Sequence, residues 1–251
     1  MNYALIKVCG MREAENIREV EKLFTLHSSL FTFWMGFIFW PKSSRYVSER
    51  PAYLPTKCKR VGVFVDEDAE TIRQIADDYA LDYIQLHGHE SPDFIRGLRN
   101  GTAAPLPAVG VPPRQWERGI GGETFIIKAF NIATKEDLEA TKPYEGLVDY
   151  FLFDAKAQLP GGSGQQFDWS VLKDYDGDTP FLLSGGIGPD DAERVKAFLT
   201  SHLFPPHSGG VRGGLLTSHK CIGIDLNSRF EIAPGLKDIN KLKSFIEKVK
   251  S

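Results

Sequence analysis

Two side chains with acid–base chemistry stand at the ends of apolar segments of this sequence. Cys9 follows the run Leu5–Val8 and precedes Gly10, and Asp154 follows the run Tyr150–Phe153. A carboxylate is rarely left at such a position without a partner or a task, because removing its charge from water is costly. A lone cysteine, by contrast, more often packs as a small apolar side chain. The position of the two residues in the predicted fold therefore has to show whether they are catalytic or only packed in the core.

A strand followed by an exit loop recurs eight times along the chain, mostly with a helical pattern behind it. The strands are predicted over 5–9, 35–40, 60–66, 83–88, 124–130, 150–154, 181–187 and, with its exit loop, 220–231. Helices are predicted over 13–24, 68–80, 134–141, 189–199 and 238–250, and two more begin near Ser91 and Asp168. This order predicts an α/β fold, a (β/α)8 TIM barrel, with residues 1–251 as a single domain. Cys9 and Asp154 would then meet at the carboxyl-terminal mouth of the barrel, where barrel enzymes keep their chemistry.

Bulk composition excludes several other classes of protein. The 251 residues are 42% hydrophobic and carry a net charge of −3 with no long block of one sign, so no nucleic-acid or membrane partner is predicted. Three widely spaced cysteines suit neither a zinc site nor a disulfide framework and indicate a reducing, cytoplasmic location. The most apolar stretch, 30–40, is far shorter than the roughly 20 residues of a membrane helix.

Two segments rich in glycine and proline interrupt the repeat, near 100–122 and near 201–219. Neither has the period of a helix or strand, so both are predicted to be loop insertions, the first with a short edge strand over 106–111. Three histidines, His202, His207 and His219, are irregularly spaced at the second segment, and we assign them no metal.

Several polar loops follow the predicted strands and suit an anionic ligand. Ser184-Gly185-Gly186 and Asn227-Ser228-Arg229 follow strands seven and eight, where backbone N–H groups of many barrels bind phosphate. Arg45 follows the second strand, as an anion ligand or as an ordinary surface cation. His87 ends the fourth strand, as a packing residue or as a base. The glycine loop 161–164, with Gly162 and Ser163, either closes over a ligand or is a flexible connector.

The ordered set of motifs resembles the phosphoribosylanthranilate isomerase family of tryptophan biosynthesis. The resemblance covers nearly the whole chain outside the two insertions. It rests on Lys7-Val8-Cys9-Gly10-Met11, Gly36-Phe37-Ile38-Phe39, Pro41-Lys42-Ser43, Arg45-Tyr46, Val61-Gly62-Val63-Phe64-Val65, Gln85-Leu86-His87-Gly88, Asp154, Gly161-Gly162-Ser163-Gly164, Phe167-Asp168-Trp169, Ser184-Gly185-Gly186, Pro234-Gly235 and Lys237-Asp238.

This resemblance implies an aldose–ketose isomerase that performs an Amadori rearrangement of an N-linked ribosyl phosphate. It makes Asp154 the general acid at the ribose ring oxygen and Cys9 the general base at C2′. Asp154 would have to hold a proton well above its reference pKa of about 3.9, and Cys9 would have to lose one at or below about 8.5. An apolar strand end would raise the first pKa, and a local cation would lower the second.

The resemblance also implies contacts to the rest of the substrate. Arg45 would pair with the anthranilate carboxylate, Gly162 and Ser163 would lie in a loop that closes over the bound molecule, and Lys7 and His87 would support the catalytic pair. The phosphate would be bound by Gly185, Gly186, Ser228 and Arg229. The small-molecule substrate would be the partner of a monomer or homodimer, with no cofactor and no metal.

Two departures from the family pattern and two alternative functions stay open at this point. Gln165 stands where many relatives have a basic residue, and Ser228-Arg229 stands where many have Ser-Gly. Another phosphate-binding barrel enzyme is one alternative, although the lysine–glutamate pairs or metal-binding histidines of such enzymes are missing from the strand ends. The other is a barrel that binds phosphorylated ligands without converting them, for which an acid–base pair has no purpose.

Overall fold

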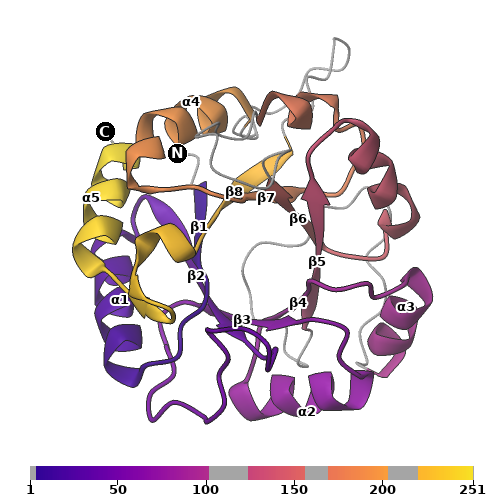
Figure 1. Cartoon of the computed structure of the whole chain (residues 1–251), viewed down its shortest axis with the longest axis horizontal. Helices are drawn as coiled ribbons and strands as arrows, with labels where there is room; N and C mark the ends of the chain where they lie inside the picture. The colour runs from indigo at the N-terminus through magenta and orange to yellow at the C-terminus, as the bar shows by residue number, and fades with distance from the viewer. Residues whose placement is uncertain (1–3, 102–123, 156–168, 203–219, 251) are drawn as a thin grey trace.

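The chain folds into a closed barrel of eight parallel strands in sequential order, with β1 pairing with β8 to complete the ring (Figure 1). This computed structural model describes residues 4–101, 124–155, 169–202 and 220–250. The strands are β1 (Ala4–Val8), β2 (Phe31–Ile38), β3 (Lys59–Phe64), β4 (Tyr83–Leu86), β5 (Phe125–Ile132), β6 (Tyr150–Ala155), β7 (Phe181–Ser184) and β8 (Cys221–Leu226). The architecture confirms the predicted (β/α)8 barrel.

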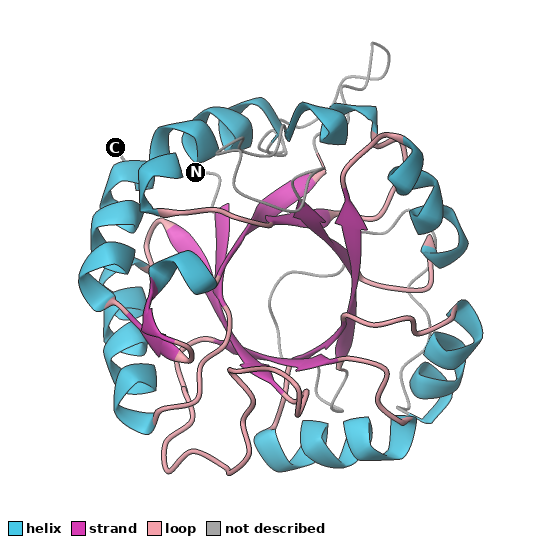
Figure 2. Cartoon of the chain, in the orientation of Figure 1, coloured by secondary structure: helices cyan, strands magenta, loops and turns pink. Residues whose placement is uncertain are grey.

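Helices surround the strands as an outer layer (Figure 2). The α-helices are α1 (Ala14–His27), α2 (Ala69–Tyr79), α3 (Pro92–Gly101), α4 (Ala192–His202) and α5 (Ile239–Lys250). Shorter 3-10 helices are η1 (Glu136–Tyr144), η2 (Trp169–Asp174), η3 (Pro189–Asp191) and η4 (Ser228–Phe230). No helix among the described residues has both the length and the apolar character needed to cross a membrane.

Local sequence signals fix several helix ends. The Asp68 carboxylate caps α2 by accepting from the backbone N–H groups of Glu70 and Thr71. Ala80 ends the same helix in the left-handed conformation, with φ of 46°. The Ser91 hydroxyl accepts from the Phe94 N–H at the start of α3, as the serine–proline pair predicted.

Side chains that point into the barrel form layers along its axis. An apolar floor contains Leu5 and Leu182 together with Trp34 stacked on Tyr83 at 3.9 Å between ring centroids. Lys7 lies one layer higher on β1 and Cys9 another layer higher, because alternate residues of a strand face the same side. The floor seals one end of the barrel, so the polar layers open only toward the other.

The structure corrects four details of the sequence prediction. β2 begins at Phe31 rather than at Met35, because its first residues pair with β1 and pack in the core. The helix predicted to begin near Asp168 is, among the described residues, the 3-10 helix η2. The helix predicted over 134–141 is the 3-10 helix η1, which contains Pro143. The exit of β8 is not a plain loop but carries the hairpin β9 (Glu231–Ala233) and β10 (Leu236–Lys237).

The two predicted insertions fall mainly on 102–123 and 203–219, outside the described residues, and so does the edge strand expected over 106–111. The described parts of those segments belong to helices, since α3 continues to Gly101 and α4 to His202.

Candidate active site

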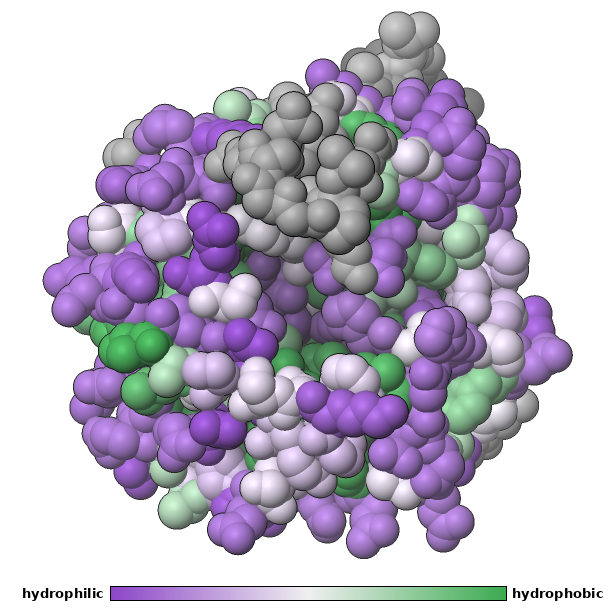
Figure 3. All heavy atoms as spheres, in the orientation of Figure 1, coloured by the Kyte–Doolittle hydropathy of each residue, from purple (hydrophilic) through white to green (hydrophobic). Residues whose placement is uncertain are grey.

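A cavity of about 350 Å3 opens at the carboxyl-terminal mouth of the barrel. The space-filling view shows a hollow lined largely by hydrophilic residues near the middle of this face (Figure 3). Its walls come from most strand ends of the barrel. They include Cys9, Trp40, Ser43, Gln85, His87, Asp154, Ser184, Gly185, Gly186, Asp225, Asn227, Ser228 and Arg229. The structure thus brings most of the predicted site residues into one pocket.

Cys9 stands directly after β1 in a position that two glycines make possible. Its backbone N–H donates to Leu226 O at 2.9 Å, which extends the β1–β8 pairing to the thiol. Gly10 turns the chain with φ of 78°, and a Cβ there would lie 2.7 Å from Cδ of Arg45. A Cβ on Gly36 would lie 2.8 Å from Cys9 Sγ. Both glycines therefore leave room for the reactive part of the site.

A buried ion pair lies one layer below the thiol. Lys7 Nζ donates to Asp225 Oδ1 at 2.9 Å, and Asp225 Oδ2 accepts from the Ser184 hydroxyl at 3.3 Å. Burial would lower the pKa of Lys7, but Asp225 and the neighbouring Cys9 raise it above its ordinary value. Lys7 is therefore held as a cation in contact with the cysteine.

The pKa of Cys9 differs in direction from the sequence expectation. Burial raises the pKa of the thiol, Lys7 and Lys237 lower it, and Asp225 raises it, and the sum lies above the ordinary value. The expected cations are present, but they do not overcome a side chain that is only 3% exposed. The expectation of a lowered pKa for Cys9 is therefore wrong.

Asp154 reaches the cavity from β6, three strands round the barrel from Cys9. Its Oδ2 faces Nε2 of His87 at 3.7 Å, and Nδ1 of His87 lies 3.1 Å from Nε2 of Gln85. An amide nitrogen only donates, and the His87 tautomer that accepts at Nδ1 directs its Nε2 proton toward Asp154. His87 is thus oriented by Gln85 and directed at the carboxyl group.

The predicted anion-binding loops lie together on one wall of the cavity. Gly185 and Gly186 follow β7 with φ of 92° and 67°, a conformation that glycine adopts without strain. Ser228 and Arg229 follow β8, and the Arg229 side chain lies against the β7 loop, 3.3 Å from the place of a Cβ on Gly188. The arginine at this unusual position therefore stays at the site and adds positive charge to it.

Arg45 does not line the cavity wall and is instead held at its edge by Glu231. Nε of Arg45 donates to Oε1 and Oε2 of Glu231 at 2.8 and 3.0 Å, and Nη2 donates to Oε2 at 2.7 Å. The Arg45 side chain is 21% exposed. Gly162 and Ser163 lie outside the described residues.

The sequence reasoning missed four polar residues around the site: Gln85, Asp225, Glu231 and Lys237. Gln85 and Asp225 both lie inside strands at inward-facing positions, and their place in an apolar segment is the signal that reveals them. Glu231 and Lys237 lie in the unpredicted hairpin, where the motif Lys237-Asp238 marked the lysine but gave no sign of its contact with Glu231.

Comparison with known protein families matches residues 6–104 and 110–248 to the family described as N-(5′-phosphoribosyl)anthranilate (PRA) isomerase. The chain belongs to this family. Among curated members, the N-(5′-phosphoribosyl)anthranilate isomerase of Parabacteroides distasonis is 44% identical, with 98% of this chain and 93% of the relative covered. The enzyme of the same name from Phocaeicola vulgatus is 42% identical, with 98% of both chains covered. The isomerase resemblance drawn from the motifs is therefore confirmed.

Solved structures of the family share the fold. Phosphoribosyl anthranilate isomerase from Thermotoga maritima superposes with a TM-score of 0.67 at 28% identity, covering 98% of each chain. Another phosphoribosyl anthranilate isomerase was solved with reduced 1-(o-carboxyphenylamino)-1-deoxyribulose 5-phosphate, with a TM-score of 0.65, 25% identity and 98% of each chain covered.

Proposed function

We propose that this chain converts N-(5′-phosphoribosyl)anthranilate to 1-(2-carboxyphenylamino)-1-deoxyribulose 5-phosphate with Asp154 as general acid and Cys9 as general base. The observation that carries the assignment is the placement of both groups on the walls of one cavity, from β6 and from the end of β1. An aldose–ketose rearrangement needs one proton delivered and another removed at different atoms of the same sugar, and two separated groups meet that need.

In the first half of the reaction, the Asp154 carboxylic acid protonates the ribose ring oxygen. The bond between that oxygen and C1′ breaks, and the nitrogen lone pair forms a Schiff base at C1′. His87 faces the same carboxyl group at 3.7 Å and supports its position.

In the second half, the Cys9 thiolate removes the proton from C2′. The electrons of the C–H bond form a C1′–C2′ double bond and neutralise the Schiff base as an enolamine. The enolamine then tautomerises to the amino ketone, so that no atom is gained or lost overall. Lys7 lies beside the thiol and stabilises the thiolate while it acts.

The two anionic ends of the substrate suit different groups at the mouth. The phosphate fits the loops of Gly185, Gly186, Ser228 and Arg229, through backbone N–H groups and one guanidinium. The anthranilate carboxylate fits Arg45 beside the cavity, because a guanidinium can pair with two carboxylates through different edges. The loop with Gly162 and Ser163 is assigned to closure over the substrate.

We also infer a cytoplasmic enzyme that works as a monomer or homodimer on a small-molecule substrate. One relative was solved as mutually generated monomers of a dimeric isomerase from Thermotoga maritima, at 25% identity and a TM-score of 0.65 with 99% of each chain covered.

The experiment that tests the function follows the fluorescence of freshly prepared N-(5′-phosphoribosyl)anthranilate after addition of the purified protein. We expect the fluorescence to disappear at a rate proportional to protein concentration. Saturable binding without loss of fluorescence would instead make this chain a non-catalytic binder of the same ligand.

A further inference from the structure

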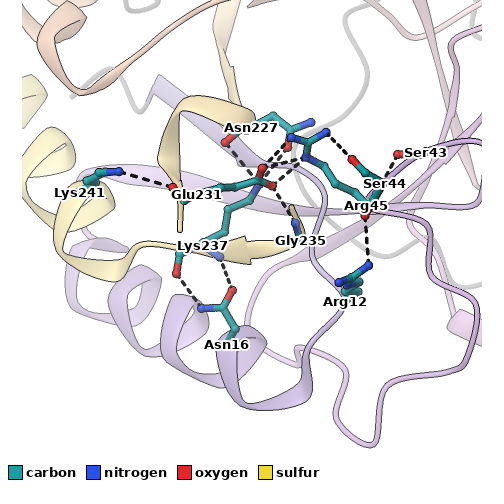
Figure 4. Close-up of polar contacts among 10 residues, drawn as sticks. All are labelled: Arg12, Asn16, Ser43, Ser44, Arg45, Asn227, Glu231, Gly235, Lys237 and Lys241. Carbon is teal, nitrogen blue, oxygen red and sulfur yellow. Dashed lines mark hydrogen bonds and ion pairs between the residues drawn. The ribbon is translucent and has the colours of Figure 1, made fainter. Parts of the chain in front are cut away.

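Glu231 lies at the centre of a polar network that joins the loop after β2 to the segment after β8 (Figure 4). Arg45 reaches it from the loop after β2, and Lys237 reaches it from β10, as the close-up shows. The Glu231 side chain is 5% exposed and that of Lys237 is fully buried. Charged groups are rarely buried to this degree without a task, and neither proton transfer uses these two.

The contact with Arg45 leaves part of the guanidinium available. Glu231 occupies the edge formed by Nε and Nη2, while Nη1 only approaches the Ser44 hydroxyl, at 3.5 Å. The Arg45 stem also passes close to Gly10, the residue after Cys9. A second carboxylate can therefore pair with the remaining edge while Glu231 stays in place.

Lys237 contributes a second cationic group to the network. Its Nζ donates to Glu231 Oε1 at 2.6 Å and to Asn227 Oδ1 at 2.9 Å. The Asn16 side chain holds the Lys237 backbone through two hydrogen bonds of 2.8 and 2.9 Å, which fix the hairpin to α1. Burial lowers the pKa of Lys237 although Glu231 opposes this effect. With an ammonium and a guanidinium against one carboxylate, the three side chains carry one net positive charge toward an incoming anion.

The contact with Glu231 fixes the Arg45 side chain in one conformation, which is important because an arginine side chain has many rotamers. Without Glu231, binding a carboxylate would have to order the Arg45 side chain as well, and that entropy cost would weaken binding. With Glu231, the guanidinium is already fixed when the ligand arrives.

We propose that Glu231 is a positioning residue, which fixes the Arg45 guanidinium for the carboxylate of the substrate while Lys237 keeps the network positive. This inference rests on the proposed role of Arg45. Glu231 touches no reacting atom, so its contribution lies in binding and in preference for a carboxylated ligand.

The test measures the binding of two ligands by calorimetry. The first is reduced 1-(o-carboxyphenylamino)-1-deoxyribulose 5-phosphate, an analogue of the product, and the second is the same reduced compound with a phenylamino group that lacks the carboxyl group. We expect Glu231→Gln to weaken binding of the first about tenfold, in the range for residues in contact, and to leave the second unchanged. In an Arg45→Met background, Glu231→Gln should have no further effect on either ligand. The exposed Glu247→Gln on α5 is the matched control and should bind both ligands like the wild type.

Equal weakening for both ligands, tighter binding by Glu231→Gln, or an undiminished effect in the Arg45→Met background would each overturn the proposal. Because Glu231→Gln leaves a buried lysine without its carboxylate, the double variant Glu231→Gln/Lys237→Met provides a better matched interior and should show the same selective loss. Failure of the proposed function is recognised separately, since the wild type would then bind the analogue but not convert the substrate.

Discussion

Lys7 and Asp225 form a 2.9 Å ion pair inside the barrel, with side chains that are 0% and 7% exposed, in contact with the proposed base Cys9. The two members of the pair have opposite effects on the pKa of the thiol. The ammonium favours the thiolate, whereas the carboxylate disfavours it. These two charges and the burial of Cys9 together set the pKa of the thiol, and therefore the pH above which Cys9 is a thiolate that can act as a base.

The first prediction concerns this pH dependence. Cys9 acts as the thiolate and its pKa is raised, so kcat/KM should increase with pH through the titration of the thiol. Asp225→Asn removes an anion that raises this pKa, so the ascending limb should move to lower pH. The exposed Asp190→Asn is the control and should leave the limb in place. A limb that stays unmoved in Asp225→Asn would refute the electrostatic role of the pair.

The second prediction concerns the two proton carriers. Cys9→Ser and Asp154→Asn should each lower kcat by about 10²–10⁴-fold, the usual size of one acid–base contribution, with KM close to that of the wild type. Steady-state kinetics on the fluorescent substrate measures both constants. Cys58→Ser, a change in a cysteine outside the cavity lining, should retain wild-type kcat. Near-normal kcat in Cys9→Ser would remove Cys9 from the mechanism.

The third prediction concerns the space around the thiol. A Cβ on Gly36 would lie 2.8 Å from Cys9 Sγ and 3.1 Å from its Cα, so Gly36→Ala should displace the cysteine. We expect a lower kcat and a loss of about 1–3 kcal/mol in the free energy of unfolding, as for an overpacked core. Urea denaturation and kinetics measure the two effects.

Gly97→Ala is the control for that change. Among the described residues, no atom beyond the chain neighbours and the helix's own backbone lies within 4 Å of a Cβ at this exposed position in α3. Alanine should therefore stabilise the helix by about 0.5–1 kcal/mol and leave kcat unchanged. Equal changes in kcat and in the free energy of unfolding for the two glycine variants would show that crowding at Cys9 does not cause the effect of Gly36→Ala.

The fourth prediction separates stability from activity at the opposite end of the barrel. Nη2 of Arg99 donates to Asp149 Oδ2 at 2.6 Å, and both side chains are buried. Arg99→Met leaves a buried carboxylate without this partner and should lower the free energy of unfolding by about 3–5 kcal/mol. The folded variant should keep its kcat, because Asp149 immediately precedes β6 and lies away from the mouth.

Arg96→Met tests the same substitution one turn earlier in sequence, on the exposed side of α3. The Arg96–Asp93 pair is in solvent, with side chains 53% and 91% exposed, so we expect a change of less than about 1 kcal/mol. A comparable loss in both variants, measured by urea unfolding, would contradict the assignment of the Arg99 effect to burial.

The sequence by itself was sufficient to predict the barrel and to place Cys9 and Asp154 at the carboxyl ends of their strands, while the acid–base roles of the two residues remain a proposal. Apolar segments at regular spacing specify strands, and a residue that follows such a segment is placed at the mouth by its own strand alone. Cys9, His87, Asp154 and Gly185 could therefore be found without knowing any long-range contact. The type of η1 could not, because an α-helix and a 3-10 helix share similar local patterns.

Only the tertiary structure decided which groups touch. Lys7 meets Asp225 across 218 positions of sequence, and Arg45 meets Glu231 across 186. Those pairs exist because β8 closes onto β1 and because the hairpin after β8 folds back to the loop after β2. Burial also reversed the expected direction for the Cys9 pKa. Exposure and charge proximity are properties of the closed barrel, and no single segment of the chain determines them.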